Sequence, residues 1–194
     1  MHALDTRDTY GLITRSLHWA TAAAIAVMLT IGWGAELLPK PAEELAMGLH
    51  ISLGIGVLAL GFARLGWWAV NRERPPHEPG LFGTVARLVQ WSLMALLVII
   101  PLSGWLLVSA SGHTPGFFGL FHLPRLVPSG EELHELGEDV HETLPWVLLA
   151  VLGLHVLGAL KHHYLDGAAT LRRMLRAGTP AAARVRAAKK RPAQ

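Results

Sequence analysis

The chain contains no cysteine among its 194 residues. Disulfide bonds, iron–sulfur clusters and thiolate zinc sites are therefore excluded, as is haem attached covalently through a C-x-x-C-H motif. Charged residues are also scarce, at 16% of the sequence, whereas 52% of the residues are hydrophobic. Any metal must be bound by histidine, carboxylate or carbonyl groups, or inside a cofactor that the chain holds without a covalent bond.

The lack of charge is concentrated in four long apolar stretches, none of which contains an Asp or Glu in its centre. Stretches of this length are too long for core strands and match the roughly 20 residues that cross a bilayer as a helix. The sequence therefore predicts an all-α integral membrane protein, a bundle of four transmembrane helices at about residues 11–38, 45–70, 81–109 and 130–165. A cleavable signal peptide is the alternative for the first stretch.

The segments outside these helices divide the chain into three parts. Residues 1–10 are expected to be a frayed N-terminal cytoplasmic segment, and residues 11–175 form the four-helix domain. Residues 176–194 are rich in Ala, Arg and Lys and are predicted to be a disordered basic cytoplasmic tail, held by anionic lipid.

The connection before the fourth helix has two features of interest. Residues 111–128 are irregular, apolar and rich in Gly, Pro and Phe, so we expect this loop to lie on the membrane surface or to cover a pocket. Ser129 and Glu132 match a capping box, which predicts that the fourth helix begins above the membrane.

Lysine and arginine are distributed very unevenly between the two sides of the predicted bundle. Fifteen of the 17 fall on the side that holds both termini, and only Lys40 and Arg125 fall on the other. The opposite side also carries nine of the 14 acidic residues. Because basic residues accumulate on the cytoplasmic side, both termini are predicted to be cytoplasmic.

Four of the eleven histidines, His18, His50, His141 and His155, lie where the predicted helices cross the membrane, at two depths. His141 and His155 are fourteen residues apart on one helix, which puts them on the same face and about 21 Å apart along its axis. Helix direction places His18 at the inner depth of His155, and His50 at the outer depth of His141. The pairs that can share a metal are therefore His18 with His155 and His50 with His141.

Two neutral imidazoles on opposite faces of a porphyrin satisfy a haem iron and leave no position for oxygen, which favours electron transfer. Gly54 and Gly158 would let a flat macrocycle approach the backbone, although close helix packing also explains them. Intramembrane histidines also serve as proton relays or bond to neighbouring carbonyls. His134 is an alternative outer ligand, but it lies farther from the membrane among acids, so His141 is preferred. The rival function is a histidine-lined metal transporter. It would need acidic partners within the helices, and the apolar centres of the helices contain no Asp or Glu.

Several motifs resemble the prokaryotic cytochrome b561 family over roughly residues 7–175: Arg15-x-x-His18-Trp19, His50 with Gly54, His141-Glu142-Thr143-Leu144, and His155 followed by His162-His163-Tyr164. The resemblance implies four helices and two non-covalent b-type haems in a bacterial inner membrane. By position it assigns the iron ligands as His18 and His155 for the inner haem, and His50 and His141 for the outer haem. The third helix departs from the pattern, with Arg87 and Gln90 where some relatives carry histidines.

The resemblance further implies electron transfer between a donor and the membrane quinone pool. One family activity is oxidation of superoxide on the outer side, with electrons passing inward to ubiquinone. Superoxide is an anion and the outer loops are net acidic, so they would repel it, unless Lys40 and Arg125 form a local positive funnel. Another outer electron donor is also compatible, and nothing points to nucleic acid. The alternative function is an integral cytochrome b subunit of a multi-subunit dehydrogenase or hydrogenase.

The inner end carries polar residues suited to quinone chemistry: Arg15, Ser16, Lys161 and His162. Quinone reduction takes up protons, and a histidine at the membrane boundary titrates near neutral pH. We therefore hypothesise that His162 donates a hydrogen bond or a proton to a quinone near the inner haem. A basic, lipid-facing helix end is the alternative explanation of these residues.

Overall fold

The computed structural model describes residues 2–73, 75, 80–167 and 170–175, so the predicted disordered tail at 176–194 lies outside the described residues. Its long elements are four helices: α1 (Leu12–Gly34), α2 (Lys40–Val70), α3 (Leu81–Ala110) and α4 (Glu131–Tyr164). The short elements are η1 (Ala35–Leu37), β1 (Gly116–Phe117), β2 (Phe121–His122) and α5 (Thr170–Leu175).

All four long helices are long and apolar enough to cross a membrane, α1 together with η1. Few of their residues are buried against other parts of the chain, and large apolar side chains such as Leu154 and Leu157 face outward. Hydrocarbon is a favourable environment for such a surface, and a helix satisfies its own backbone hydrogen bonds there. The predicted four-helix membrane bundle is confirmed.

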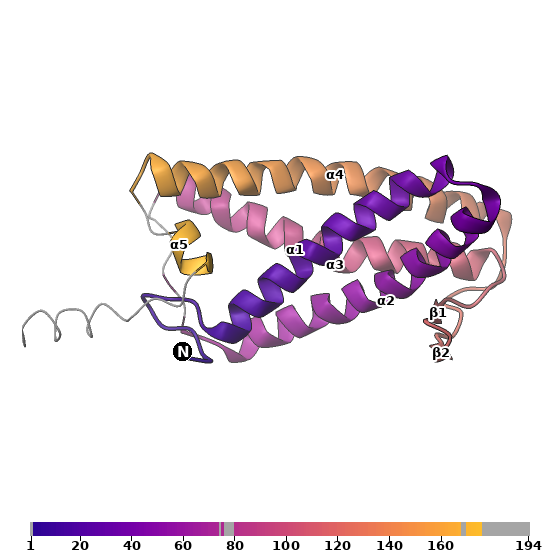
Figure 1. Cartoon of the computed structure of the whole chain (residues 1–194), viewed down its shortest axis with the longest axis horizontal. Coiled ribbons are helices and arrows are strands. Elements are labelled where there is room, and N and C mark those ends of the chain that lie inside the picture. Colours follow the sequence, from indigo (N-terminus) through magenta and orange to yellow (C-terminus); the bar gives the residue numbers. More distant parts are fainter. Residues whose placement is uncertain (1, 74, 76–79, 168–169, 176–194) are drawn as a thin grey trace, which may run out of the picture.

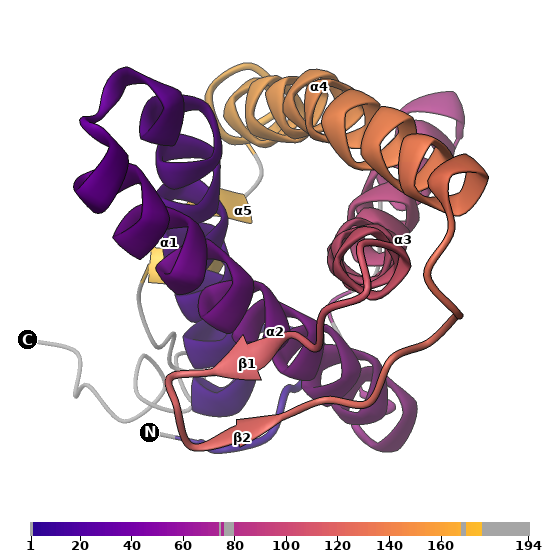
Figure 2. The same cartoon turned by 90° about the vertical axis from the view of Figure 1, so that its right-hand side faces the viewer.

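Successive helices run in opposite directions along the bundle (Figure 1). The most extensive helix–helix contact joins α3 to α4, and α2 contacts both α1 and α3. Gly137 of α4 permits the α3–α4 contact, because a Cβ there would lie only 3.1 Å from the Leu107 Cα. The N-terminal segment and α5 share one end, which we call the inner end. The β-hairpin lies at the other, which we call the outer end (Figures 1 and 2).

Two helix starts differ from those that the sequence predicts. Helix α2 begins at Lys40, five residues before the expected Leu45, because the chain enters the helix directly after the extended Pro39. Helix α4 begins at Glu131 with Gly130 as its N-cap and no side-chain cap hydrogen bond. The predicted capping box at Ser129 is therefore wrong, since Ser129 precedes the N-cap.

The loop at 111–128 is not wholly irregular, because β1 and β2 pair in an antiparallel hairpin with Gly116 opposite His122. The buried Ser52 side chain of α2 anchors this hairpin: its hydroxyl oxygen lies 3.1 Å from the Gly116 carbonyl and accepts a hydrogen bond from the Phe118 N–H at 3.0 Å. Pro115, just before β1, lines a cavity between the helices. The start of this loop therefore borders a pocket.

The N-terminal segment is folded back onto the start of α1, so the prediction that it is frayed is wrong. The Asp5 carboxylate is 5% exposed and accepts a hydrogen bond from the Gly11 N–H at 2.6 Å. The Leu12 N–H donates to the His2 carbonyl at 2.9 Å. A Cβ at Gly11 would collide with the backbone of Ala3, so this tight turn requires glycine.

Candidate functional site

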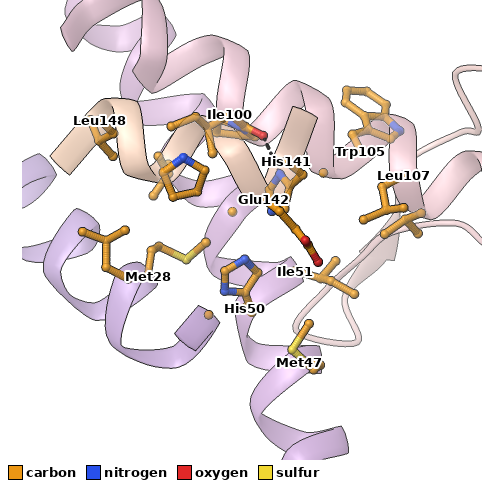
Figure 3. A pocket seen from close by; sticks show the side chains of 18 of the residues that line it. Met28, Met47, His50, Ile51, Ile100, Trp105, Leu107, His141, Glu142 and Leu148 are labelled. Carbon is orange, nitrogen blue, oxygen red and sulfur yellow. Dashed lines mark hydrogen bonds between the residues drawn. The ribbon is translucent and has the colours of Figure 1, made fainter. Parts of the chain in front are cut away.

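The outer histidine pair joins α2 to α4. The ring centres of His50 and His141 lie 6.0 Å apart with an interplanar angle of 88°. Two imidazoles that bind one metal ion from opposite sides, at about 2.0 Å per metal–nitrogen bond, have ring centres roughly 6 Å apart. The spacing of the outer pair therefore suits two ligands of a single iron. Figure 3 shows the two rings on facing helices.

Helix α3 contributes no histidine but orients the His141 ring. The His141 Nδ1 lies 2.9 Å from the Ser103 hydroxyl oxygen and 3.1 Å from the Ile100 carbonyl oxygen (Figure 3). A carbonyl oxygen can only accept, so Nδ1 carries the proton and donates. Ser103 in turn donates its own hydrogen to the Ile100 carbonyl at 2.7 Å. This network leaves the Nε2 of a neutral His141 unprotonated and suited to bind a metal.

His50 lacks such support. Its Nδ1 is buried and has no hydrogen-bond partner in the part of the chain that the structure describes. Its ring instead lies against α1, where a Cβ at Gly32 would be 3.2 Å from the His50 Cε1. A buried polar atom without a partner is uncommon in native proteins and often marks a site that binds something else.

A cavity of about 600 Å³ adjoins the outer pair. Two glycines lie in its wall. A Cβ at Gly54 would be 3.6 Å from the Met28 Cε, and a Cβ at Gly104 would be only 2.8 Å from the His141 Cε1. The volume is in the range of cofactor pockets, and most of the lining is apolar. Four acidic side chains also line it: Glu36, Glu43, Glu138 and Glu142.

The inner histidine pair joins α1 to α4. The ring centres of His18 and His155 are 6.2 Å apart, which repeats the spacing of the outer pair. The Trp19 ring packs edge-on against His18 at 5.2 Å. A Cβ at Gly158 would meet no atom of the described chain within 4 Å. Close helix packing therefore does not explain Gly158, and space beside the inner pair is open.

The structure brings together both histidine pairs that the depth argument predicts. His134, the alternative outer ligand, lies instead beside Glu138, with its Nδ1 3.9 Å from the carboxylate. Within the described ranges no three His, Asp or Glu side chains converge as they would around a bare metal ion. Two facing imidazoles are the donor set that suits a porphyrin iron, whose other four ligands come from the macrocycle.

The quinone candidates on α4 form one hydrogen-bonded cluster at the inner end. The Asp166 carboxylate accepts a hydrogen bond from the Lys161 ammonium at 2.8 Å and lies 2.7 Å from the His162 Nδ1. The hydrogen bond from Lys161 is the main cause that lowers the pKa of Asp166, and that from His162 adds to it. The Lys161 Nζ also lies 4.3 Å from the centre of the Phe82 ring. Sequence reasoning missed Asp166, although it follows His162 by four residues.

The two candidates on α1 differ from each other. Ser16 is exposed, whereas Arg15 is half-buried and its Nε atom is buried without a hydrogen-bond partner in the described chain. Arg15 precedes His18 by three residues and so lies on the same face of α1. Of the two, only Arg15 lies on the face of α1 that carries His18.

Four membrane-spanning helices that hold facing imidazoles at two levels define the class of integral membrane cytochromes. The chain belongs to the prokaryotic cytochrome b561 family, which it matches over residues 9–177. The family resemblance deduced from the histidine motifs is thereby confirmed. Membership identifies the chain as a bacterial membrane protein of electron transport and implies that it binds b-type haem.

Three relatives match nearly the whole chain. Cytochrome b561 homolog 2 of Escherichia coli (strain K12) is 30% identical, over 90% of this chain and 95% of its own length. Cytochrome b561 homolog 1 of the same strain is 29% identical, over 82% of this chain and 92% of its own length. A protein named probable superoxide oxidase CybB, from Yersinia pestis, is 25% identical over 86% of this chain and 95% of its own length.

Replacing Ser103 tests whether it positions His141. In Ser103→Ala, His141 keeps only the Ile100 carbonyl as its partner, so we expect haem bound by the outer pair to be lost to an acceptor protein about tenfold faster. The low-spin electron paramagnetic resonance signal of that haem should also shift. Ser103→Thr retains the hydroxyl and should behave as wild type. Unchanged loss rate and signal in Ser103→Ala would contradict a positioning role.

Proposed function

We propose that this protein is a di-haem b-type cytochrome that carries electrons across the bacterial inner membrane between an outer donor and the quinone pool. His50 and His141 would hold the outer haem iron, and His18 and His155 the inner one. The observation that carries the proposal is the stacking of two imidazole pairs, each about 6 Å between ring centres, at two levels of one bundle. Bound haem would supply one-electron redox chemistry, and the protein's imidazoles would exclude oxygen from the iron.

We propose that the inner end faces the cytoplasm. Fifteen of the 17 lysines and arginines belong to that side, which is the bias expected of a cytoplasmic face. The N-terminal segment and α5 lie together there, and the hairpin lies at the opposite end (Figure 1). The hairpin and the acid-lined cavity would then face the periplasm.

The charges of the two ends support inward electron flow. Acidic side chains, among them Glu138 and Glu142, line the cavity beside the outer pair. The Arg64 guanidinium interacts electrostatically with the inner pair, His18 and His155. Because negative charge disfavours an added electron and positive charge favours it, the inner centre should have the higher reduction potential.

Superoxide is a candidate for the outer electron donor because one relative is named a probable superoxide oxidase. The electrostatics around the outer cavity oppose attraction of an anion, however. Lys40, one of the two outer cations, is paired with Glu43 at 2.8 Å, which leaves less positive charge to attract superoxide.

At the inner end we propose that His162 supplies a proton to a bound quinone, with ubiquinone as the expected substrate. His162 follows His155 by seven residues, which puts it on the same helix face and about 10 Å closer to the inner surface. Asp166, kept ionised by its lowered pKa, provides the counter-charge for a protonated His162 ring. Lys161 shares the same carboxylate and would help to hold it in place.

Removing one histidine of each pair tests the haem assignment. The purified wild-type protein should show a reduced, six-coordinate b-type spectrum with two haems per chain. His50→Ala and His18→Ala should each retain one haem, with the spectrum and potential of the opposite site unchanged. His134→Ala should keep both. A colourless wild-type preparation, or loss of an outer haem in His134→Ala, would reject the assignment.

Salt dependence tests superoxide as the donor. If acidic residues surround its approach, the rate constant for haem reduction after a superoxide pulse should rise a few-fold between low and moderate ionic strength. Stopped-flow absorbance, with and without quinone, measures this rate. Glu138→Gln should accelerate the reaction at low salt only. A rate constant that falls with added salt would instead indicate a positive funnel, and absence of reduction would exclude superoxide.

Replacing Asp166 tests the quinone site. In Asp166→Asn the protonated His162 ring loses its counter-charge, so quinone reduction should slow several-fold. His162→Ala should slow the reaction further. His163→Ala is the matched control. If His162→Ala leaves quinone reduction unchanged while both haems remain bound, the assignment fails.

A further inference from the structure

The inner site contains a cation that has no anionic partner among the residues that the structure describes. Arg64 of α2 is half-buried inside a membrane-spanning helix. Among the described residues, the ion pairs are made by other side chains, and none involves Arg64. Charged groups at membrane depth are costly and are normally paired or engaged in function. Its position therefore requires an explanation.

A hydrogen bond between α1 and α2 fixes the depth of Arg64. The Trp67 Nε1–H donates to the Thr14 hydroxyl oxygen at 2.8 Å, so these two residues are level on antiparallel helices. His18 lies one turn toward the bilayer centre from Thr14, and Arg64 lies three residues toward it from Trp67. Arg64 is therefore level with His18 on the neighbouring helix, in agreement with its electrostatic interaction with both inner rings.

Arg15 adds a second cation on the adjoining helix. It lies one turn nearer the inner surface than His18, and its buried Nε has no hydrogen-bond partner in the described chain. Asp166 at the inner end of α4 is bonded to Lys161 and His162, and no described ion pair involves either arginine. Arg64 is thus level with the inner pair and Arg15 lies one turn from it, and neither has an ion-pair partner among the described residues.

We propose that Arg64, assisted by Arg15, binds the propionate carboxylates of the inner haem. This inference rests on the proposed function, because it requires a haem between His18 and His155. A guanidinium offers paired N–H donors that match a carboxylate in a bidentate arrangement, and burial strengthens such charge-assisted hydrogen bonds. The bound carboxylate would in turn balance the charge that the bundle places at this depth.

The outer cavity supplies the contrast. Its lining contains four glutamates and neither lysine nor arginine. Carboxylates of an outer haem would therefore be repelled from that lining and directed toward solvent. The two arginines are a feature of the inner site alone, so their removal should distinguish one haem from the other.

The experiment compares haem b with its dimethyl ester, which lacks free carboxylates. Full-length protein made in haem-limited cells is loaded in membranes with either compound, as wild type, Arg64→Gln and Arg64→Lys. With haem b, Arg64→Gln should weaken retention of the inner haem about tenfold or more, and Arg64→Lys less. With the ester, all three proteins should retain the inner haem equally, because no carboxylate remains to be bound.

Two controls accompany this comparison. The outer haem, measured in the same samples, reports whether each variant is folded, and its retention should not change. Arg87→Gln removes an exposed arginine whose partner is the Thr84 hydroxyl, and should have no effect with either compound. In redox titrations with haem b, Arg64→Gln should lower the midpoint potential of the inner haem only.

The outcomes separate the inference from the proposed function. Equal loss of haem b and ester in Arg64→Gln would show that Arg64 acts through packing, and no loss with either would show that it binds no cofactor carboxylate. Either result overturns the inference while leaving two haems per chain in the wild type. A wild-type protein that binds no inner haem would instead overturn the proposed function.

Discussion

An imidazole inside a bilayer needs a partner, because hydrocarbon offers neither water nor a polar group to satisfy its ring nitrogens. This requirement connects all four long helices. Helix α4 carries one histidine of each pair, α1 and α2 each face it with the other, and α3 supplies the Ser103 hydroxyl and the Ile100 carbonyl that orient His141. The histidine-free helix is therefore part of the site. Its Gly104 also permits the His141 ring to approach, since a Cβ there would collide with it.

The two histidines of the outer pair differ in their hydrogen-bond support. The His141 Nδ1 donates to the Ile100 carbonyl, whereas the Nδ1 of its partner His50 is buried and finds no hydrogen-bond partner among the described residues. A ligand whose other nitrogen donates to a carbonyl is a stronger electron donor to its metal than one without that bond. Of the two residues that would hold an outer haem, His141 would therefore be the more basic ligand.

The features predictable from sequence are those governed by periodicity and charge. Helix number follows from the apolar stretches, and the pairing of His18 with His155 follows from helix direction and spacing. The hairpin could not be predicted because two-residue strands have no periodic signal. The role of Ser103 could not be predicted because its hydrogen bond to His141 spans 38 residues. From the sequence alone, Arg64 cannot be distinguished from the other basic residues assigned to the cytoplasmic side.

The depth of Arg64 depends on a contact that the sequence does not reveal, the bond from Trp67 to Thr14. The start of α2 could not be predicted from hydropathy either, because its first turn is polar and adds no hydropathy signal. Hydropathy marks where a helix meets hydrocarbon, whereas backbone hydrogen bonding decides where it begins. The same limit explains why the folded N-terminal turn at Asp5 was expected to be frayed.

Depth also separates two kinds of chemistry at the inner end. Arg64 is level with His18, and Arg15 lies about 4.5 Å nearer the inner surface, at 1.5 Å per residue. His162 lies about 10 Å from His155 in the same direction, so it sits beyond both arginines. A quinone that takes protons from His162 would then occupy the level of Lys161 and Asp166, while the arginines face the cofactor's own carboxylates. On this proposal Arg15, first considered for the quinone, would bind the haem carboxylates, and proton transfer would be kept apart from the charges that set the potential of the inner centre.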